Sequence, residues 1–157
     1  MSIGGWDWSE EDGWPFEGDE AIDFMDCLVM TAKREDHALM DSLMKAPLST
    51  AVGKDGFLDV GSGEAVVVIA ALLDSKLNGT AYGYGRRLRS DKDGPGVSDA
   101  EVYARWVELL WFPWVKSRAE LAVAALGRVL GADSGLAQSR DQVWRGRMEE
   151  LRARLSR

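Results

Sequence analysis

The most apolar stretch of this chain runs from Ala65 to Leu73, where nine consecutive residues are apolar. Nine residues are too few to cross a bilayer, because a membrane-spanning helix needs about 20. A glycine-bearing segment precedes the run, and Asn78-Gly79, a helix stop signal, follows it. We therefore predict a central helix that is buried on most of its sides, around which the rest of the chain has to pack.

Helical periodicity recurs on both sides of this run. Apolar residues at three- and four-residue steps predict a helix that begins at Asp19, whose side chain can cap it. Further helices are predicted over roughly Asp36–Lys45, with Pro47 ending it nearby, and over Ser98–Leu110, Ser117–Leu130 and Gln138–Leu155. Ser98 and Glu101 have the spacing of a capping box. No alternating strand pattern and no internal repeat is evident, so the predicted fold class is all-α or mainly α.

Length and composition favour one domain. A chain of 157 residues that is 46% hydrophobic and 29% charged is ordinary for a globular protein and can bury a core without a metal or disulfide. Its single cysteine rules out an internal disulfide and a Cys-rich zinc module. We expect a compact single-domain bundle of five or six helices over residues 1–157, with an ordered aromatic arm at residues 1–18. The Gly- and Arg-rich residues 79–97 are predicted to form a mobile surface loop.

Charge is distributed unevenly along the chain. The formal net charge of −7 argues against nucleic-acid binding. Residues 1–32 contain nine acidic residues and no basic one, whereas residues 140–157 contain six arginines and three acids. Two interpretations stay open. In the first, the segments are two solvated faces, or an acidic N-terminal edge that lies against the basic C-terminal helix. In the second, the acidic patch steers a basic protein partner.

Large aromatic side chains stand among the acids of the N-terminal arm, with Trp6, Trp8 and Trp14 in a segment rich in Gly, Asp and Glu. Such rings are typical anchors of protein interfaces. The predicted partner-binding residues are Trp6, Trp8, Glu10, Glu11, Asp12, Trp14 and Phe16. The other large aromatic residues lie in or beside helical stripes and are predicted to be core: Trp106, Trp111, Phe112, Trp114 and Trp144.

One segment, Phe57–Ala65, resembles the first motif of S-adenosylmethionine-dependent methyltransferases, in which a strand ends in Asp-x-Gly-x-Gly before a helix. Here Ala65 stands in place of the usual third glycine, and no second strand ending in an acid follows some twenty residues later. We therefore interpret the segment as a helix entry, and predict no cofactor.

The other chemically reactive residues have ordinary interpretations. His37, the one histidine, is predicted to lie on the surface, and Cys27, between Met25 and Leu28, is predicted to be an inert buried thiol. Four acids at helical spacing could in principle bind a divalent cation: Asp19, Glu20, Asp23 and Asp26. Acids in the first turn of a helix are common, so no metal-binding and no catalytic residue is predicted.

Residues 16–24, Phe-Glu-Gly-Asp-Glu-Ala-Ile-Asp-Phe, resemble the opening of a bacterial family of uncharacterised proteins, domain of unknown function 4259. Members typically begin Gly-x-Trp-Gly-x-Gly-x-Phe-x-Asn-Asp-x-Ala-x-Asp-Phe. Gly5-Trp6 is similar to that start, with a short insertion before Phe16, and Gly18 replaces the Asn of the Asn-Asp pair. The segments 57–73 and 143–155 are similar to the family's buried Ala-rich helix and its terminal Trp…Leu…Leu helix. The resemblance implies a fold and brings no established activity.

The leading functional hypothesis is a non-enzymatic, acidic, protein-binding protein, in its most concrete form an immunity protein that neutralises a basic toxin or nuclease. One alternative is a small S-adenosylmethionine-binding or metal-dependent enzyme. Another is an accessory protein that associates with itself through its amphipathic last helix. The N-terminus lacks the features of a signal peptide and no apolar run reaches 18 residues, so we expect a cytoplasmic protein that does not bind membranes.

Overall fold

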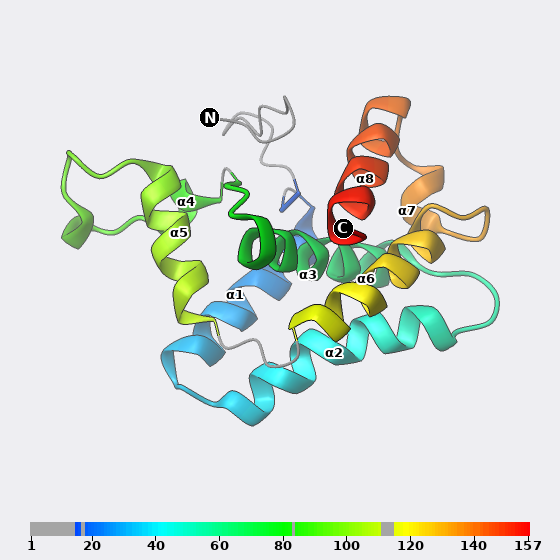
Figure 1. Cartoon of the computed structure of the whole chain (residues 1–157), viewed down its shortest axis with the longest axis horizontal. Coiled ribbons are helices and arrows are strands. Elements are labelled where there is room, and N and C mark those ends of the chain that lie inside the picture. Colours follow the sequence, from blue (N-terminus) through cyan, green and yellow to red (C-terminus); the bar gives the residue numbers. More distant parts are fainter. Residues whose placement is uncertain (1–14, 17, 83, 111–114) are drawn as a thin grey trace.

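The structure, a computed structural model, describes residues 15–16, 18–82, 84–110 and 115–157 (Figure 1). Its centre is α3 (Val60–Asn78). Four long helices pack around α3: α1 (Asp19–Lys33), α2 (His37–Gly53), α6 (Val115–Val129) and α8 (Gln142–Leu155). Because the described residues contain six helices of 11 residues or more, counting α5 below, the prediction of a mainly α bundle of five or six helices is confirmed.

The apolar run forms the buried central helix that the sequence predicts. Within α3, Glu64 and every residue from Val66 to Ser75 are buried. Asp59 caps the helix, since its carboxylate accepts the amide of Ser62 at 2.7 Å. Gly79 ends it in the left-handed conformation, at φ 72°, which glycine adopts without steric cost.

Segment 79–97, predicted to be a surface loop, includes two short helical elements. These are α4 (Gly85–Leu88) and the 3₁₀ turn η2 (Asp91–Asp93). Arg89 connects the segment to the next helix, α5 (Asp99–Leu109), because its Nε donates to the Asp99 carboxylate at 2.8 Å and its Nη atoms donate to two loop carbonyls. Together α4 and α5 form the lobe at the left of Figure 1.

Two predicted helix ends are wrong. Pro47 does not end the second helix but lies inside α2, which continues to Gly53. Proline removes one helical hydrogen bond, but Leu48 and Ala51 beyond it are fully buried, so core packing carries the helix past that break. The last predicted helix begins four residues late, at Gln142, because Asp141 caps α8, while Gln138 ends the separate four-residue α7 (Gly135–Gln138), which Ser134 caps.

Candidate functional site

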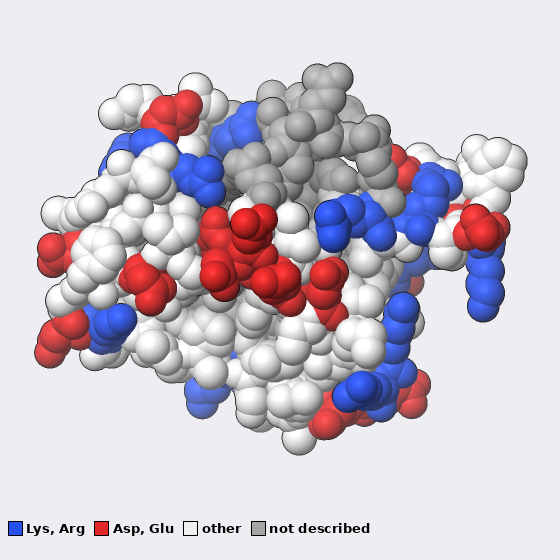
Figure 2. Space-filling view, turned by 180° about the vertical axis from the view of Figure 1, so that it is seen from behind, with Lys and Arg blue, Asp and Glu red and all other residues white. Residues whose placement is uncertain are grey.

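One face of α1 carries the acidic residues that follow the N-terminal arm. Asp19, Glu20, Asp23 and Asp26 are all exposed, at positions that share one side of the helix. The opposite side, which includes Met25 and Leu28, is buried against the bundle. Figure 2 shows the molecule from behind, with acidic side chains gathered at the centre of the face and basic ones to its sides. We call Asp19, Glu20, Asp23 and Asp26 the α1 acidic face.

Most of this face has no charge partner within the part of the chain that the structure describes. Among the described residues, Asp19, Glu20 and Asp23 form no ion pair. Asp26 accepts a hydrogen bond from the Tyr84 hydroxyl at 3.3 Å, and the Arg87 guanidinium lies 5.8 Å from the centre of the Tyr84 ring. The α1 acidic face itself does not lie against α8, because α8 packs chiefly on α3 and α6 whereas α1 packs chiefly on α2 and α3.

Of the predicted partner-binding residues, one lies in the described part of the chain. Trp6, Trp8, Glu10, Glu11, Asp12 and Trp14 lie outside the described residues. The ring of Phe16 is only 3% exposed and its centre lies 5.0 Å from that of Tyr84 and 6.0 Å from that of Tyr82. The prediction that Phe16 contacts a partner is therefore wrong, because its ring fills the core of this fold.

The start of α1 is held by a residue of the central helix. The residue before α1, Gly18, has no side chain to cap it, and Asp19, the predicted cap, is instead its first helical residue. The carboxylate of Glu64 takes the capping role, because its Oε2 accepts the Ala21 amide at 3.2 Å. Its Oε1 lies 3.4 Å from Nη2 of Arg140.

Glu64 lies among apolar side chains, which changes its protonation. Val67, Leu136 and Trp144 surround a cavity of about 10 Å³ beside the carboxylate. Burial raises the pKa of Glu64 above its ordinary value, against the opposing effects of the Ala21 amide and of Arg140. The carboxylate that positions the α1 acidic face is therefore itself sensitive to pH.

A second buried polar cluster joins the C-terminal helix to the core. Asp74 is fully buried and accepts hydrogen bonds from Tyr82 Oη at 2.7 Å, Asn78 Nδ2 at 2.8 Å and Arg154 Nε at 3.1 Å. Next to it, the hydroxyls of Ser75 and Tyr103 are 2.8 Å apart. Burial raises the pKa of both Tyr82 and Tyr103 above the usual range. These groups satisfy one another inside the bundle, so we assign the cluster a structural role.

The predicted core tryptophans behave as expected where the structure describes them. Trp106 and Trp144 are each 7% exposed, whereas Trp111, Phe112 and Trp114 lie outside the described residues. Trp144 belongs to the apolar stripe of α8, whose other members Met148 and Leu151 are fully buried. The apolar side of α8, on which the self-association hypothesis depends, is therefore packed in the core of this chain.

The glycine segment is a helix entry in the structure. Leu58 forms one parallel bridge with Ser134, and the chain then turns directly into α3. The α3 amide of Ser62 is already occupied by Asp59, and the Glu20 and Leu136 side chains lie close to Gly61 and Gly63. The small size of these glycines is therefore used for the packing of α1 and α7 on α3.

The remaining reactive residues show one correction. His37 is exposed, as predicted, at the start of α2. Cys27 is exposed rather than buried, because position 27 lies off the Met25–Leu28 stripe and shares the side of Asp23. The part of the chain that the structure describes contains no group of three or more His, Cys, Asp or Glu side chains able to hold a metal ion.

No helix among the described residues has both the length and the apolar character required to cross a bilayer.

Sequence reasoning missed three residues that organise the interior: Glu64, Asp74 and Arg154. Arg154 is one of the arginines of residues 140–157, for which a solvated face is one of the interpretations above, but its side chain is 1% exposed. Glu64 and Asp74 directly flank the apolar run Ala65–Leu73, which is predicted to be buried on most sides. A charged residue at each end of a buried helix needs a partner of opposite charge or a hydrogen-bond donor. The positions of Glu64 and Asp74 beside the run were therefore the signal in the sequence that such partners lie elsewhere in the chain.

The fold and the acidic face define a small, mainly helical protein with an exposed row of carboxylates on α1. A family model described as Domain of unknown function (DUF4259) matches residues 12–147, so the chain belongs to this family. This confirms the resemblance seen in residues 16–24. Neither the curated proteins nor the solved structures contain a match to this chain.

Proposed function

We propose that this protein acts without catalysis, by binding a basic protein through the α1 acidic face and the acid-rich residues that precede it. The observation that carries the proposal is that Asp19, Glu20 and Asp23 are exposed on one helical side and, among the described residues, form no ion pair. A basic partner would supply the missing opposite charge.

The physical basis of the proposal is electrostatic steering. Like charges held on one rigid face produce a field that accelerates encounter with a basic surface and disfavours acidic competitors. Trp6, Trp8 and Trp14 would supply the apolar anchors of the same contact, since steering alone contributes more to rate than to affinity.

In its most concrete form the protein is a cytoplasmic neutraliser, such as an immunity protein that covers the cationic cleft of a toxin or nuclease. Support for this form is the surplus of acids at one end of the chain, where nine acidic residues precede the first basic one. Substrates of nucleases are polyanions, so an acidic face is complementary to the surface that binds them.

The test is an affinity pull-down from lysate of the source organism, at low salt and at about 0.5 M salt, where screening shortens the range of charge interactions to a few Å. The expected result is one basic protein recovered near one to one at low salt and lost at high salt. A parallel pull-down uses a variant with Asp91→Lys and Asp133→Lys combined, two exposed positions outside α1. It tests whether a change in net charge alone is enough to lose the partner. If a recovered partner has an enzymatic activity, loss of that activity on adding the protein supports the neutraliser form.

A further inference from the structure

Two carboxyl groups from different helices meet where α1 begins beside the central helix. Glu64 of α3 is buried, whereas Glu20 is an exposed member of the α1 acidic face. A Cβ at Gly61 would lie 3.3 Å from the carboxyl carbon of Glu20, so this carboxyl group lies against the first turn of α3. Because positions 61 and 64 share one side of that helix, Glu20 and Glu64 lie on the same side of α3.

The charge of Glu64 is favoured by one neighbour and opposed by the other. Among the described residues, the charged groups that act on it are Arg140, from the turn between α7 and α8, and Glu20 of α1. Arg140 Nη2 lies 3.4 Å from Glu64 Oε1, which is longer than the usual hydrogen bond. Burial, and to a lesser extent the charge of Glu20, favours the protonated form, and together they raise the pKa of Glu64.

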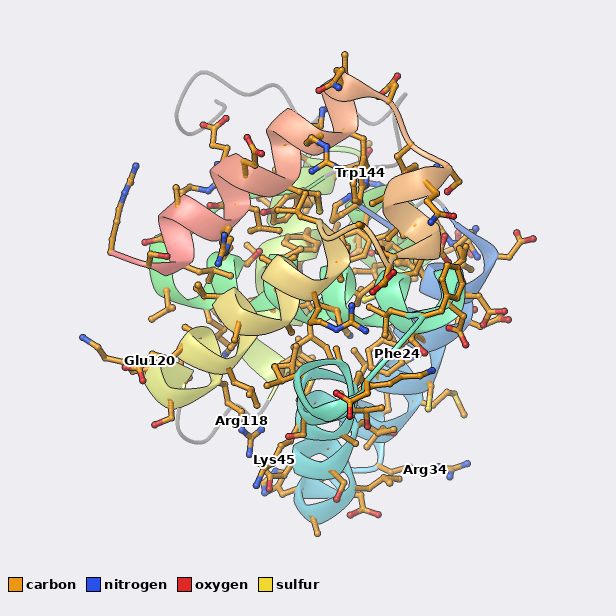
Figure 3. The ribbon with its side chains drawn as sticks, turned by 90° about the vertical axis from the view of Figure 1, so that its right-hand side faces the viewer. Phe24, Arg34, Lys45, Arg118, Glu120 and Trp144 are labelled. Atoms are coloured by element: carbon orange, nitrogen blue, oxygen red, sulfur yellow. The ribbon has the colours of Figure 1, made fainter. Side chains whose placement is uncertain are left out.

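The other surroundings of Glu64 keep water away from its carboxyl group. Apolar side chains of three helices line the cavity beside it: Val67, Leu136 and Trp144. In Figure 3, Trp144 lies on the side of α8 that faces the central helix. Pro15 and Gly18 line the same cavity, so the chain enters α1 directly over Glu64. A charge brought to Glu20 is therefore less screened at Glu64 than it would be between two groups in water.

We propose that Glu64 is a proton switch of the α1 acidic face, which ionises when a cationic partner binds beside Glu20 and takes up a proton when the partner leaves. The inference rests on the function proposed above. A cation beside Glu20 cancels the repulsion between the two carboxylates, so the bound state favours ionised Glu64. Binding then releases a proton to solvent, and affinity rises with pH through the range in which Glu64 titrates and levels off above it.

The first test needs no partner, because Glu20→Lys places a cation where the partner's would be. Protonation of Glu64 is followed by NMR, from the shift of its side-chain carboxyl carbon with pH. The midpoint is expected to fall by about 0.5 pH unit or more in Glu20→Lys, and by less in Glu20→Gln, which only removes the charge. Asp91→Lys makes the same change of charge at an exposed position outside α1 and should leave the midpoint unchanged.

The second test measures binding, with fluorescently labelled decalysine as the cationic probe and the full chain at low salt. Glu64→Gln is locked in the uncharged state, and all other carboxylates are shared with the natural protein. Fluorescence anisotropy is expected to give a Kd about three times larger for Glu64→Gln than for the natural protein at pH 8. The ratio should fall toward one as the pH is lowered to about 4.5, because the natural protein then also carries an uncharged residue 64.

Two results would overturn the proposal. The first is a Glu64 midpoint that Glu20→Lys leaves unchanged, because the two carboxyl groups would then not be coupled. The second is a Kd ratio that stays constant with pH, because Glu64 would then act on the face only by positioning α1.

Failure of the proposed function gives a different result. If Glu20→Lys lowers the midpoint as expected but decalysine does not bind at 1 mM, the two carboxyl groups are coupled and the α1 acidic face is not a cation-binding surface. The switch then falls together with the proposed function, whereas an unchanged midpoint contradicts the switch alone.

Discussion

The carboxylate of Glu64, on the central helix, accepts the backbone amide of Ala21 at 3.2 Å and so caps α1 from 43 positions away in the sequence. A cap on α1 itself would fix only the direction of its own first turn. A cap from α3 also fixes where α1 begins relative to the core, and hence where Asp19 and Asp23 are presented. The surface that we propose to bind a partner is therefore positioned by a buried side chain.

Removing the cap should destabilise the fold. Glu64→Ala leaves the Ala21 amide without its acceptor, and the expected loss is about 1 kcal/mol of unfolding free energy, the usual value of an N-terminal cap. Glu64→Gln keeps an acceptor oxygen and removes the buried charge, so it should be at least as stable as the natural protein at neutral pH. Urea denaturation of the two variants checks both values, and equal losses in both would contradict the capping role.

The difference in unfolding free energy between Glu64→Gln and the natural protein should depend on pH. Because the pKa of Glu64 is raised in the folded state, the folded protein holds this proton more tightly than the unfolded chain does. The stability gained from that proton is fully present below the ordinary pKa of 4.5 and is lost as pH rises through the raised pKa. The advantage of Glu64→Gln should therefore grow from about pH 4 upward and then level off. A constant difference across this range would show that Glu64 does not titrate in this way.

Gly18 should tolerate no side chain, because a Cβ at this position would lie 1.8 Å from Glu64 Oε1. Gly18→Ala is expected to cost about 1–3 kcal/mol, as overpacking does. Gly146→Ala is the matched control, since no atom lies within 4 Å of its Cβ and alanine favours a helix interior by about 1 kcal/mol. Thermal unfolding of both variants should give shifts of opposite sign. Destabilisation by both, to the same degree, would contradict the close approach.

The contacts of Glu64 and of Leu48 separate the features that the sequence could predict from those that it could not. Helix periodicity and the Ala65–Leu73 run predicted the central helix and the order of the helices around it, because burial on one side repeats locally. Local rules also predicted Asp19 as a cap and Pro47 as a stop, and both failed where a distant contact decides the outcome. The carboxylate of Glu64 replaces the first, and packing of Leu48 overrides the second.

The site was less predictable than the fold for a related reason. Acidic residues of α1 could be placed on one exposed side from their spacing alone. The exposure of Cys27 also follows from its place off the Met25–Leu28 stripe. The burial of Phe16, in contrast, depends on which rings lie opposite it, and Arg154 is buried because Asp74 faces it from another helix. A single sequence carries no direct signal for such pairings.

Breaking the buried pair of Asp74 and Arg154 should be costly. Asp74→Ala leaves the Arg154 guanidinium, 1% exposed, without this carboxylate, and the expected loss is about 3–5 kcal/mol. Tyr82→Phe removes one donor to Asp74 and should cost about 1–2 kcal/mol. Arg105→Ala, which breaks an exposed pair with Asp93, should leave the denaturation midpoint nearly unchanged. Equal effects of the buried and exposed substitutions in urea unfolding would contradict the assignment.

Glu35, in the turn between α1 and α2, should be replaceable with a gain. Its backbone has φ 56°, in the left-handed region, which is unfavourable for residues other than glycine. Glu35→Gly is expected to raise the unfolding free energy by about 0.5–1 kcal/mol, whereas Glu35→Ala keeps the Cβ and should give no gain. Differential scanning calorimetry of both variants separates the effect of backbone conformation from the loss of a charge. A gain in unfolding free energy for Glu35→Ala as large as for Glu35→Gly would contradict an unfavourable backbone conformation at this position.

The central claim is that the α1 acidic face binds a basic protein, and its most direct test is the association rate of the captured partner. Stopped-flow binding would compare the natural protein with Asp19→Lys and Asp23→Lys combined, and with the control Asp91→Lys and Asp133→Lys. We predict a fall of at least tenfold in association rate for the α1 variant at low salt, with a much smaller fall for the control. Equal association rates for the natural protein and the α1 variant at low salt would contradict the claim.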